Sequence, residues 1–177
     1  MIFMKELEIP AGVGASVDLD VVTVKGSLGS NSRRFNSALL SVKVAGNKIT
    51  ITPNSSRILG KKAYVAQTSF AKELSNDMQG VMKYFEIKMQ STHAHFPLTL
   101  EQRGNVLMIK NMIGERAPRS ANVVGNTKIE VKGQDVRLYG TSLDDVSQTA
   151  ANIRKACKTR RKDERVFQDG VYYAIEE

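Results

Sequence analysis

The chain has 177 residues, of which 26 are Lys or Arg and 18 are Asp or Glu, so its formal net charge is +8. Its 41% hydrophobic content is too high for intrinsic disorder, and its single Cys excludes a disulfide scaffold or an all-cysteine zinc module. No apolar run approaches the roughly 18 residues of a membrane helix, and the first ten residues lack the apolar core of a signal peptide. The composition predicts a soluble, basic, intracellular protein of one or two domains that does not bind a membrane.

Alternation of apolar and polar residues predicts strands in the first part of the chain, at residues 17–25, 40–44 and 49–51. A turn signal lies between the last two runs, which therefore read as a hairpin. Residues 61–79 contain neither Pro nor Gly, and their apolar residues recur at steps of three and four, which predicts a helix. Gly80 stands where the glycine of a helix C-cap is expected.

The second part of the chain shows the same order of signals. Strands are predicted near residues 85–89 and 106–109, and a hairpin is predicted over residues 128–139, with a turn at Gly133. A second helix is predicted to begin at Ser142, whose hydroxyl can cap the first turn. One face of this helix carries an apolar stripe, which predicts burial of Leu143, Val146, Ala150, Ile153 and Cys157.

Direct comparison of the two halves indicates an internal repeat. Residues 24–26 correspond to residues 109–111 at an offset of about 85, and residues 49–51 correspond to residues 129–131 at an offset of 80. The predicted fold class is α+β, with two tandem similar domains, each a small antiparallel sheet packed against one helix. The expected domains are residues 1–80 and 81–177. The alternative is two unrelated stretches that share a common α+β pattern.

The residues that could carry catalysis do not form a recognisable constellation. His93 and His95 alternate on a strand-like segment, but two His without a nearby Cys or carboxylate are too few for a zinc site. Cys157 lies on the apolar stripe, which favours a thiol buried in the core. The alternative is a reactive thiol, because Lys155 and Lys158 provide part of the electropositive surroundings that a reactive thiol needs. The glycines near Gly12 lack the spacing of a dinucleotide-binding motif. The sequence therefore predicts no catalytic residue, no metal, no cofactor and no enzymatic activity.

The positive charge is concentrated locally. Residues 154–165, named here the basic segment, hold seven basic residues against two acidic ones, a net charge of +5. Cations that complement a helix C-terminus explain the first two or three of these charges, but not the continuation into the predicted non-helical tail. A second basic cluster lies in a predicted loop at residues 110–119, and Arg33 and Arg34 lie at the corresponding place in the first half. With few aromatic residues, this pattern favours recognition of structured RNA through its backbone and shape.

Three segments resemble the large-subunit ribosomal protein six family, called protein nine in eukaryotes, in its archaeal/eukaryotic form. They are residues 96–97, 112–119 and 162–172. Residues 22–26 are similar to the first-domain strand and turn of that family, and residues 148–153 are similar to its second-domain helix. The short termini look more archaeal than eukaryotic. The sequence departs from the family at Ser27, where proline is common, and at Tyr173, where a smaller β-branched residue is usual.

The resemblance implies two α+β domains of duplicated origin and a structural role in the large ribosomal subunit. It implies binding to 23S-type rRNA near the base of the lateral stalk and the sarcin–ricin loop, mainly through the second domain. The implied partners are this rRNA, neighbouring ribosomal proteins of the stalk base and translation factors, with no self-oligomer, on cytoplasmic ribosomes. The alternative is a non-ribosomal nucleic-acid-binding or regulatory module.

Together, the two basic clusters and the resemblance select ten cations as the expected RNA-binding residues, with Phe167, Asp169, Gly170 and Tyr172 expected to shape the tail. The expected RNA-binding residues are Lys110, Arg116, Arg119, Arg154, Lys155, Lys158, Arg160, Arg161, Lys162 and Arg165.

Overall fold

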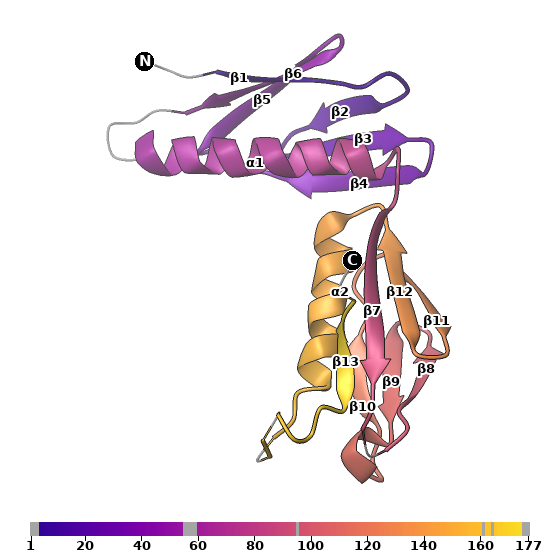
Figure 1. Ribbon diagram of the computed structural model, residues 1–177. Coiled ribbons are helices and arrows are strands. Elements are labelled where there is room, and N and C mark those ends of the chain that lie inside the picture. The colour runs from indigo at the N-terminus through magenta and orange to yellow at the C-terminus, as the bar shows by residue number, and fades with distance from the viewer. Residues whose placement is uncertain (1–3, 55–59, 95, 161, 164, 175–177) are drawn as a thin grey trace. The chain divides into compact units, whose positions relative to one another are not determined.

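The computed structural model describes residues 4–54, 60–94, 96–160, 162–163 and 165–174. The chain divides into two compact units, residues 1–84 and 85–177 (Figure 1). Each unit combines antiparallel strands with one α-helix in its described residues, which confirms the predicted α+β class. Each contains two small sheets rather than the single sheet that was predicted. Within the described residues, neither helix is long and apolar enough to cross a membrane.

The first unit consists of a three-stranded sheet in the order β1-β6-β5, a three-stranded sheet in the order β2-β3-β4, and the helix α1. The predicted hairpin is confirmed, because β5 pairs with β6 antiparallel across a two-residue turn. The bounds of the elements are β1 Lys5–Glu8, β2 Gly14–Asp18, β3 Val21–Gly26, β4 Gly29–Arg34, β5 Leu40–Ala45, β6 Lys48–Pro53 and α1 Gly60–Gly80.

The first core extends past the end of α1. Val81, one residue beyond the helix, is fully buried in this core, and its carbonyl oxygen accepts a hydrogen bond from the backbone N–H of Leu28. A Cβ at Gly26 would lie 2.8 Å from the same carbonyl oxygen, so only glycine allows the β3–β4 turn to approach so closely. Gly80 is the last residue of α1, and the unit ends after Tyr84 rather than after Gly80 because these contacts hold the following turn.

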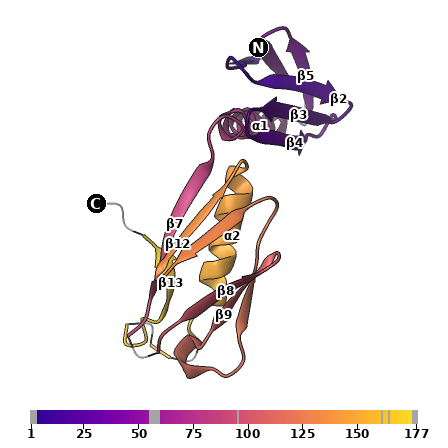
Figure 2. The ribbon, with the colours of Figure 1, turned by 90° about the vertical axis from the view of Figure 1, so that its right-hand side faces the viewer.

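The second unit repeats this plan and adds one strand. It consists of a four-stranded sheet in the order β11-β12-β7-β13, a three-stranded sheet in the order β10-β9-β8, a 3-10 turn η1 and the helix α2 (Figure 2). The bounds of the elements are β7 Phe85–Thr92, β8 Thr99–Arg103, β9 Val106–Lys110, η1 Met112–Gly114, β10 Arg119–Asn122, β11 Lys128–Lys132, β12 Asp135–Gly140, α2 Leu143–Ala156 and β13 Gly170–Tyr173.

The strand orders define the internal repeat. In both units a first strand is followed by a three-stranded meander, a hairpin and a helix, and the second strand of the hairpin pairs with the first strand. The order β1-β6-β5 thus matches β7-β12-β11, with β13 added on the free edge of β7. By this topology residues 49–51 on β6 correspond to β12, not to residues 129–131 on β11. The predicted offset of 80 was wrong because both strands of a hairpin show the same alternation.

The predicted second helix is confirmed in its cap and in four of the five residues of its buried face, whereas Leu143 is only partly buried. The Ser142 hydroxyl oxygen accepts a hydrogen bond of 3.3 Å from the backbone N–H of Asp145. Val146, Ala150 and Ile153 are fully buried, and Cys157, which caps the helix C-terminus, is 1% exposed. α2 contacts strands of both sheets of the second unit. Figure 2 shows the helix beside β7 and β12.

The buried position of Cys157 predicts an unreactive thiol. Burial raises the pKa of the Cys157 thiol above its ordinary value, so little thiolate is present near neutral pH. We expect an aromatic disulfide reagent at about pH 8 to modify the native thiol at least about tenfold more slowly than the thiol of the urea-unfolded chain. Equal rates in the two states would contradict a core position.

Candidate nucleic-acid interface

The basic segment begins on the last turn of α2 and continues beyond the helix. Cys157 and Thr159 are buried, whereas Lys158 and Arg160 are exposed. Because buried and exposed side chains alternate here, the backbone is anchored to the second unit while the cations reach solvent. Arg161 lies outside the described residues.

Beyond α2, the described residues of the basic segment lie in a loop that is attached to the sheet on its far side. The Asp163 carbonyl oxygen accepts a hydrogen bond of 3.0 Å from the backbone N–H of Phe167. The Lys162 ammonium lies 4.5 Å from the centroid of the Phe167 ring. Asp169 is buried and accepts a hydrogen bond from the backbone N–H of Ala94, after which β13 pairs with β7. The described residues of the predicted cationic tail therefore belong to a loop held by the sheet rather than to a free extension.

Two of the predicted RNA-binding residues have close partners within the second unit. The Arg154 guanidinium lies over the ring of Tyr172 on β13, 4.3 Å from its centroid, which is a cation–π contact. Lys110 on β9 forms an ion pair with Glu101 on β8. The hydrogen bond from Lys110, followed by that from Arg103, lowers the pKa of Glu101 below its ordinary value.

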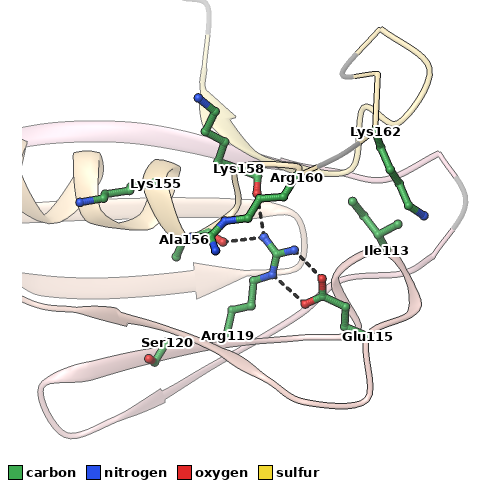
Figure 3. A pocket seen from close by; sticks show the side chains of 9 residues that line it. All are labelled: Ile113, Glu115, Arg119, Ser120, Lys155, Ala156, Lys158, Arg160 and Lys162. Atoms are coloured by element: carbon green, nitrogen blue, oxygen red, sulfur yellow. Dashed lines mark hydrogen bonds and ion pairs between the residues drawn. The ribbon is translucent and has the colours of Figure 1, made fainter.

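Arg119, at the start of β10, makes four hydrogen bonds within the second unit (Figure 3). Its Nε and Nη2 donate to the two carboxylate oxygens of Glu115, at 2.8 and 2.6 Å. Its Nη1 donates to the backbone carbonyl oxygens of Ala156 and Lys158, both at 2.9 Å. Hydrogen bonding from Arg119 lowers the pKa of Glu115, and the carboxylate in turn raises the pKa of Arg119. Arg119 thus links the loop before β10 to the C-terminal end of α2.

The loop that carries Glu115 has a defined backbone shape. Asn111 and Ile113 both have positive φ angles, 60° and 53°, which are uncommon for residues other than glycine. Met112 between them is buried at 1% exposure, and the Asn111 side-chain amide donates to the carbonyl oxygen of Pro97. Since burial and hydrogen bonding hold this backbone in a strained conformation, the loop presents Glu115 in a fixed position.

The loop and the basic segment enclose a cavity of about 500 Å³ on the second unit (Figure 3). Five cations and one carboxylate are among its nine lining residues. These residues are Ile113, Glu115, Arg119, Ser120, Lys155, Ala156, Lys158, Arg160 and Lys162. A second hollow of about 340 Å³ shares Ser120, Lys155, Ala156 and Arg160 with the first and continues along β10 and α2 to Asn122 and Asn152. Together they form a cationic groove.

The structure brings only part of the predicted set together at this groove. Lys155, Lys158, Arg160, Lys162 and Arg119 line the first cavity, whereas the remaining described cations of the predicted set do not. Those other cations are Lys110, Arg116, Arg154 and Arg165.

The groove also includes polar residues that the sequence reasoning missed, namely Ser120, Asn122 and Asn152. Asn152 lies three residues before Lys155 on α2, and its amide donates to the carbonyl oxygen of Asn122. That helical spacing is the signal that could have extended the prediction toward these residues.

In the first unit, Arg33 has an internal role. Its guanidinium donates to both carboxylate oxygens of Asp77 on α1, at 2.7 and 3.1 Å, and to Glu73 at 3.1 Å. Arg33 therefore joins β4 to α1. Residues 29–34, where the sequence placed Arg33 and Arg34 at a position corresponding to the basic loop of the second half, form the paired strand β4.

The described residues contain no group of three or more His, Cys, Asp or Glu side chains placed to hold a metal ion. His93 is exposed, and His95 lies outside the described residues.

The Glu115–Arg119 ion pair predicts a specific loss of stability in acid. Since the native pKa of Glu115 lies below its ordinary value of 4.5, the unfolded chain binds the proton more readily. The stabilisation from this pair is therefore complete above about pH 4.5 and is lost as the pH falls through the native pKa. We expect the urea midpoint of wild type to exceed that of Glu115→Gln at about pH 7, and this difference to disappear as the pH is lowered to about 3. A gap that is constant with pH would contradict this assignment.

Two units with the same strand order, the second with a cationic groove, define a duplicated α+β protein with a surface suited to polyanions. The family model described as Ribosomal protein L6 matches residues 102–170. The chain is 40% identical over 168 residues to large ribosomal subunit protein uL6 of Methanosarcina mazei, covering 95% of this chain and 94% of the relative. It is 38% identical to uL6 of Methanocella arvoryzae and of Methanobrevibacter smithii, covering 96% and 98% of this chain and 94% and 96% of those relatives.

The chain therefore belongs to the ribosomal protein L6 family, as the sequence resemblance indicated. Members of this family are structural rather than enzymatic components of the ribosome, so the predicted non-enzymatic role is confirmed by the family. Membership implies ribosomal RNA and ribosomal proteins as partners and the ribosome as the location.

Proposed function

We propose that this chain is a structural constituent of the large ribosomal subunit and that its second unit, residues 85–177, makes the main contact with large-subunit rRNA. The assignment of the rRNA contact to the second unit rests on the cationic groove, where residues from β10, α2 and the basic segment surround one hollow. Cations on an anchored backbone neutralise phosphates at a lower entropic cost than cations on a free tail, because less conformational freedom is lost on binding.

The exposed cations of the groove are the primary phosphate contacts in this proposal. Lys155, Lys158 and Arg160 are exposed, and within the described part of the chain they form no ion pair. They are therefore available to an external anion. Asn122, Asn152 and Ser120 along the same groove can hydrogen-bond to phosphate or 2′-hydroxyl oxygens of folded RNA. Arg116 and Arg165, both exposed, extend the cationic surface beyond the groove.

The RNA region in this proposal is the one that the family resemblance implies, namely the base of the lateral stalk and the sarcin–ricin loop. Neighbouring ribosomal proteins of the stalk base and translation factors are the proposed protein partners there, on cytoplasmic ribosomes.

The full chain should bind an rRNA fragment that contains the stalk base and the sarcin–ricin loop at least about tenfold more tightly than a small-subunit rRNA fragment of equal length at the same salt concentration. Filter binding measures both affinities, and sedimentation through a gradient shows whether the chain migrates with the large subunit. Equal affinity for the two fragments, together with release of the protein from the large subunit in a moderate-salt wash, would instead support the non-ribosomal alternative.

A further inference from the structure

We propose that Arg119 is a positioning residue rather than an RNA contact. It forms with Glu115 a clamp, named here the Glu115–Arg119 clamp, that holds the backbone of residues 155–160 of the basic segment in the conformation that binds RNA phosphates. This inference rests on the proposed RNA-binding function of the second unit and assigns a role within it.

The hydrogen bonds of Arg119 leave little of its guanidinium for an external anion. A guanidinium has five N–H donors. Arg119 makes two hydrogen bonds to Glu115 and two to backbone carbonyl oxygens, all between 2.6 and 2.9 Å. Its side chain is 20% exposed. Four of the five donors are therefore engaged, and a phosphate finds at most one N–H group unless it replaces these partners, so the residue acts through the groups that it holds.

The two carbonyl oxygens that Arg119 binds lie at the point where α2 ends. The last carbonyl groups of a helix have no partner within the helix and carry its negative pole, which repels phosphate. Arg119 pairs with the carbonyl oxygens of Ala156 and Lys158, on either side of the capping residue Cys157. The same contacts fix the backbone between Lys155 and Arg160, which line the groove. One guanidinium therefore neutralises the helix end and orients the exposed cations.

Glu115 also fits a positioning role. In the described part of the chain, Glu115 is the one carboxylate among the nine residues that line the first cavity. Lys162 and Arg160 lie near enough to interact with its negative charge. A carboxylate facing an RNA site opposes phosphate binding unless it serves another purpose. Here it binds Arg119 through two parallel hydrogen bonds, the geometry that orients a guanidinium most strictly.

The clamp and simple electrostatics predict effects of opposite sign for Glu115→Gln. Removal of a negative charge from a cationic surface should tighten RNA binding if only charge matters. If Glu115 orients Arg119, the same substitution should weaken binding to the stalk-base rRNA fragment, by about tenfold, because the basic segment is less preorganised. Arg119→Lys keeps the charge but cannot make all four hydrogen bonds, so it should weaken binding to a similar extent. The double variant should be no weaker than either single variant, because the clamp is already lost.

Two further measurements separate positioning from direct contact and from general destabilisation. In Arg119→Gln, which removes the charge, the slope of log affinity against log salt should change by less than about 0.7, whereas the loss of a direct phosphate contact would reduce it by about 0.7 to 0.9. Hydrogen exchange of the free variants should increase at the backbone amides of residues 157–160, with α1 as an internal reference.

Glu86→Gln is the matched control, because Glu86 pairs with Arg137 through the same side-on geometry, at 2.6 and 2.7 Å, elsewhere on the second unit. It should leave RNA affinity within about twofold of wild type. Tighter binding by Glu115→Gln, or wild-type binding by Arg119→Lys, would overturn the clamp even though the wild-type chain binds rRNA. If wild type itself does not prefer the stalk-base fragment, the proposed function fails, and the exchange measurement alone still tests whether Arg119 holds residues 157–160.

Discussion

Replacing Lys155, Lys158, Arg160 and Lys162 together by alanine should remove most of the salt dependence of binding to large-subunit rRNA. Each cation that neutralises a phosphate contributes about 0.7 to 0.9 to the slope of log affinity against log salt, so four lost contacts should reduce that slope by about three. These four side chains line one cavity and are exposed. Their loss should therefore weaken binding at low salt by several orders of magnitude. Filter binding between about 50 and 200 mM salt measures both quantities.

A control variant removes the same number of charges from the first unit. Lys25, Lys43, Lys62 and Lys72 are exposed on β3, β5 and α1. Their replacement by alanine should change the slope by less than one, since the proposed rRNA contact lies in the second unit. Equal losses in the two variants would show that net charge, rather than the groove, determines binding.

The second large effect is expected in the first unit, from Asp77→Ala. The Asp77 side chain is 4% exposed and accepts two hydrogen bonds from Arg33, whose own side chain is 21% exposed. Removal of the carboxylate leaves a mostly buried guanidinium without its main partner, which should cost about 2 to 4 kcal/mol. Urea unfolding followed by hydrogen exchange at amides of α1 and β4 measures this loss for the first unit separately from the second.

Glu73→Ala is the control for this prediction, since Glu73 binds the same Arg33 from the preceding turn of α1. Its side chain is 41% exposed, so solvent screens the interaction, and the expected loss is at most about 1 kcal/mol. Losses of equal size in the two variants would argue against the special role of Asp77. The stalk-base rRNA fragment should bind Glu73→Ala as it binds wild type, because the change lies outside the proposed interface.

The elements that sequence predicted well are those with a strong local pattern. The β5–β6 and β11–β12 hairpins, α1 and α2 were all expected, because alternation, helical spacing and the Ser142 cap are properties of neighbouring residues. The strands β4 and β10 were not expected. β4 reads GSNSRR and β10 reads RSAN, so neither shows apolar alternation, and each pairs only because the centre strand of its meander provides an edge.

What the sequence by itself determined is the α+β class, the internal repeat, the family and the concentration of cations after α2, because composition, periodicity and motifs are written along the chain. Only the tertiary structure decided how those cations are used. Arg33 and Arg119 look like any other surface arginine in the sequence, but Arg33 is held by two carboxylates of α1, and Arg119 is held by one carboxylate and two backbone carbonyl oxygens. A guanidinium reaches only a few ångströms in space, but its partners can be far away along the chain. Ala156 lies 37 positions from Arg119, and Asp77 lies 44 positions from Arg33. The net charge therefore indicated a polyanion, while the fold distinguished the cations that face solvent from those that hold the protein together.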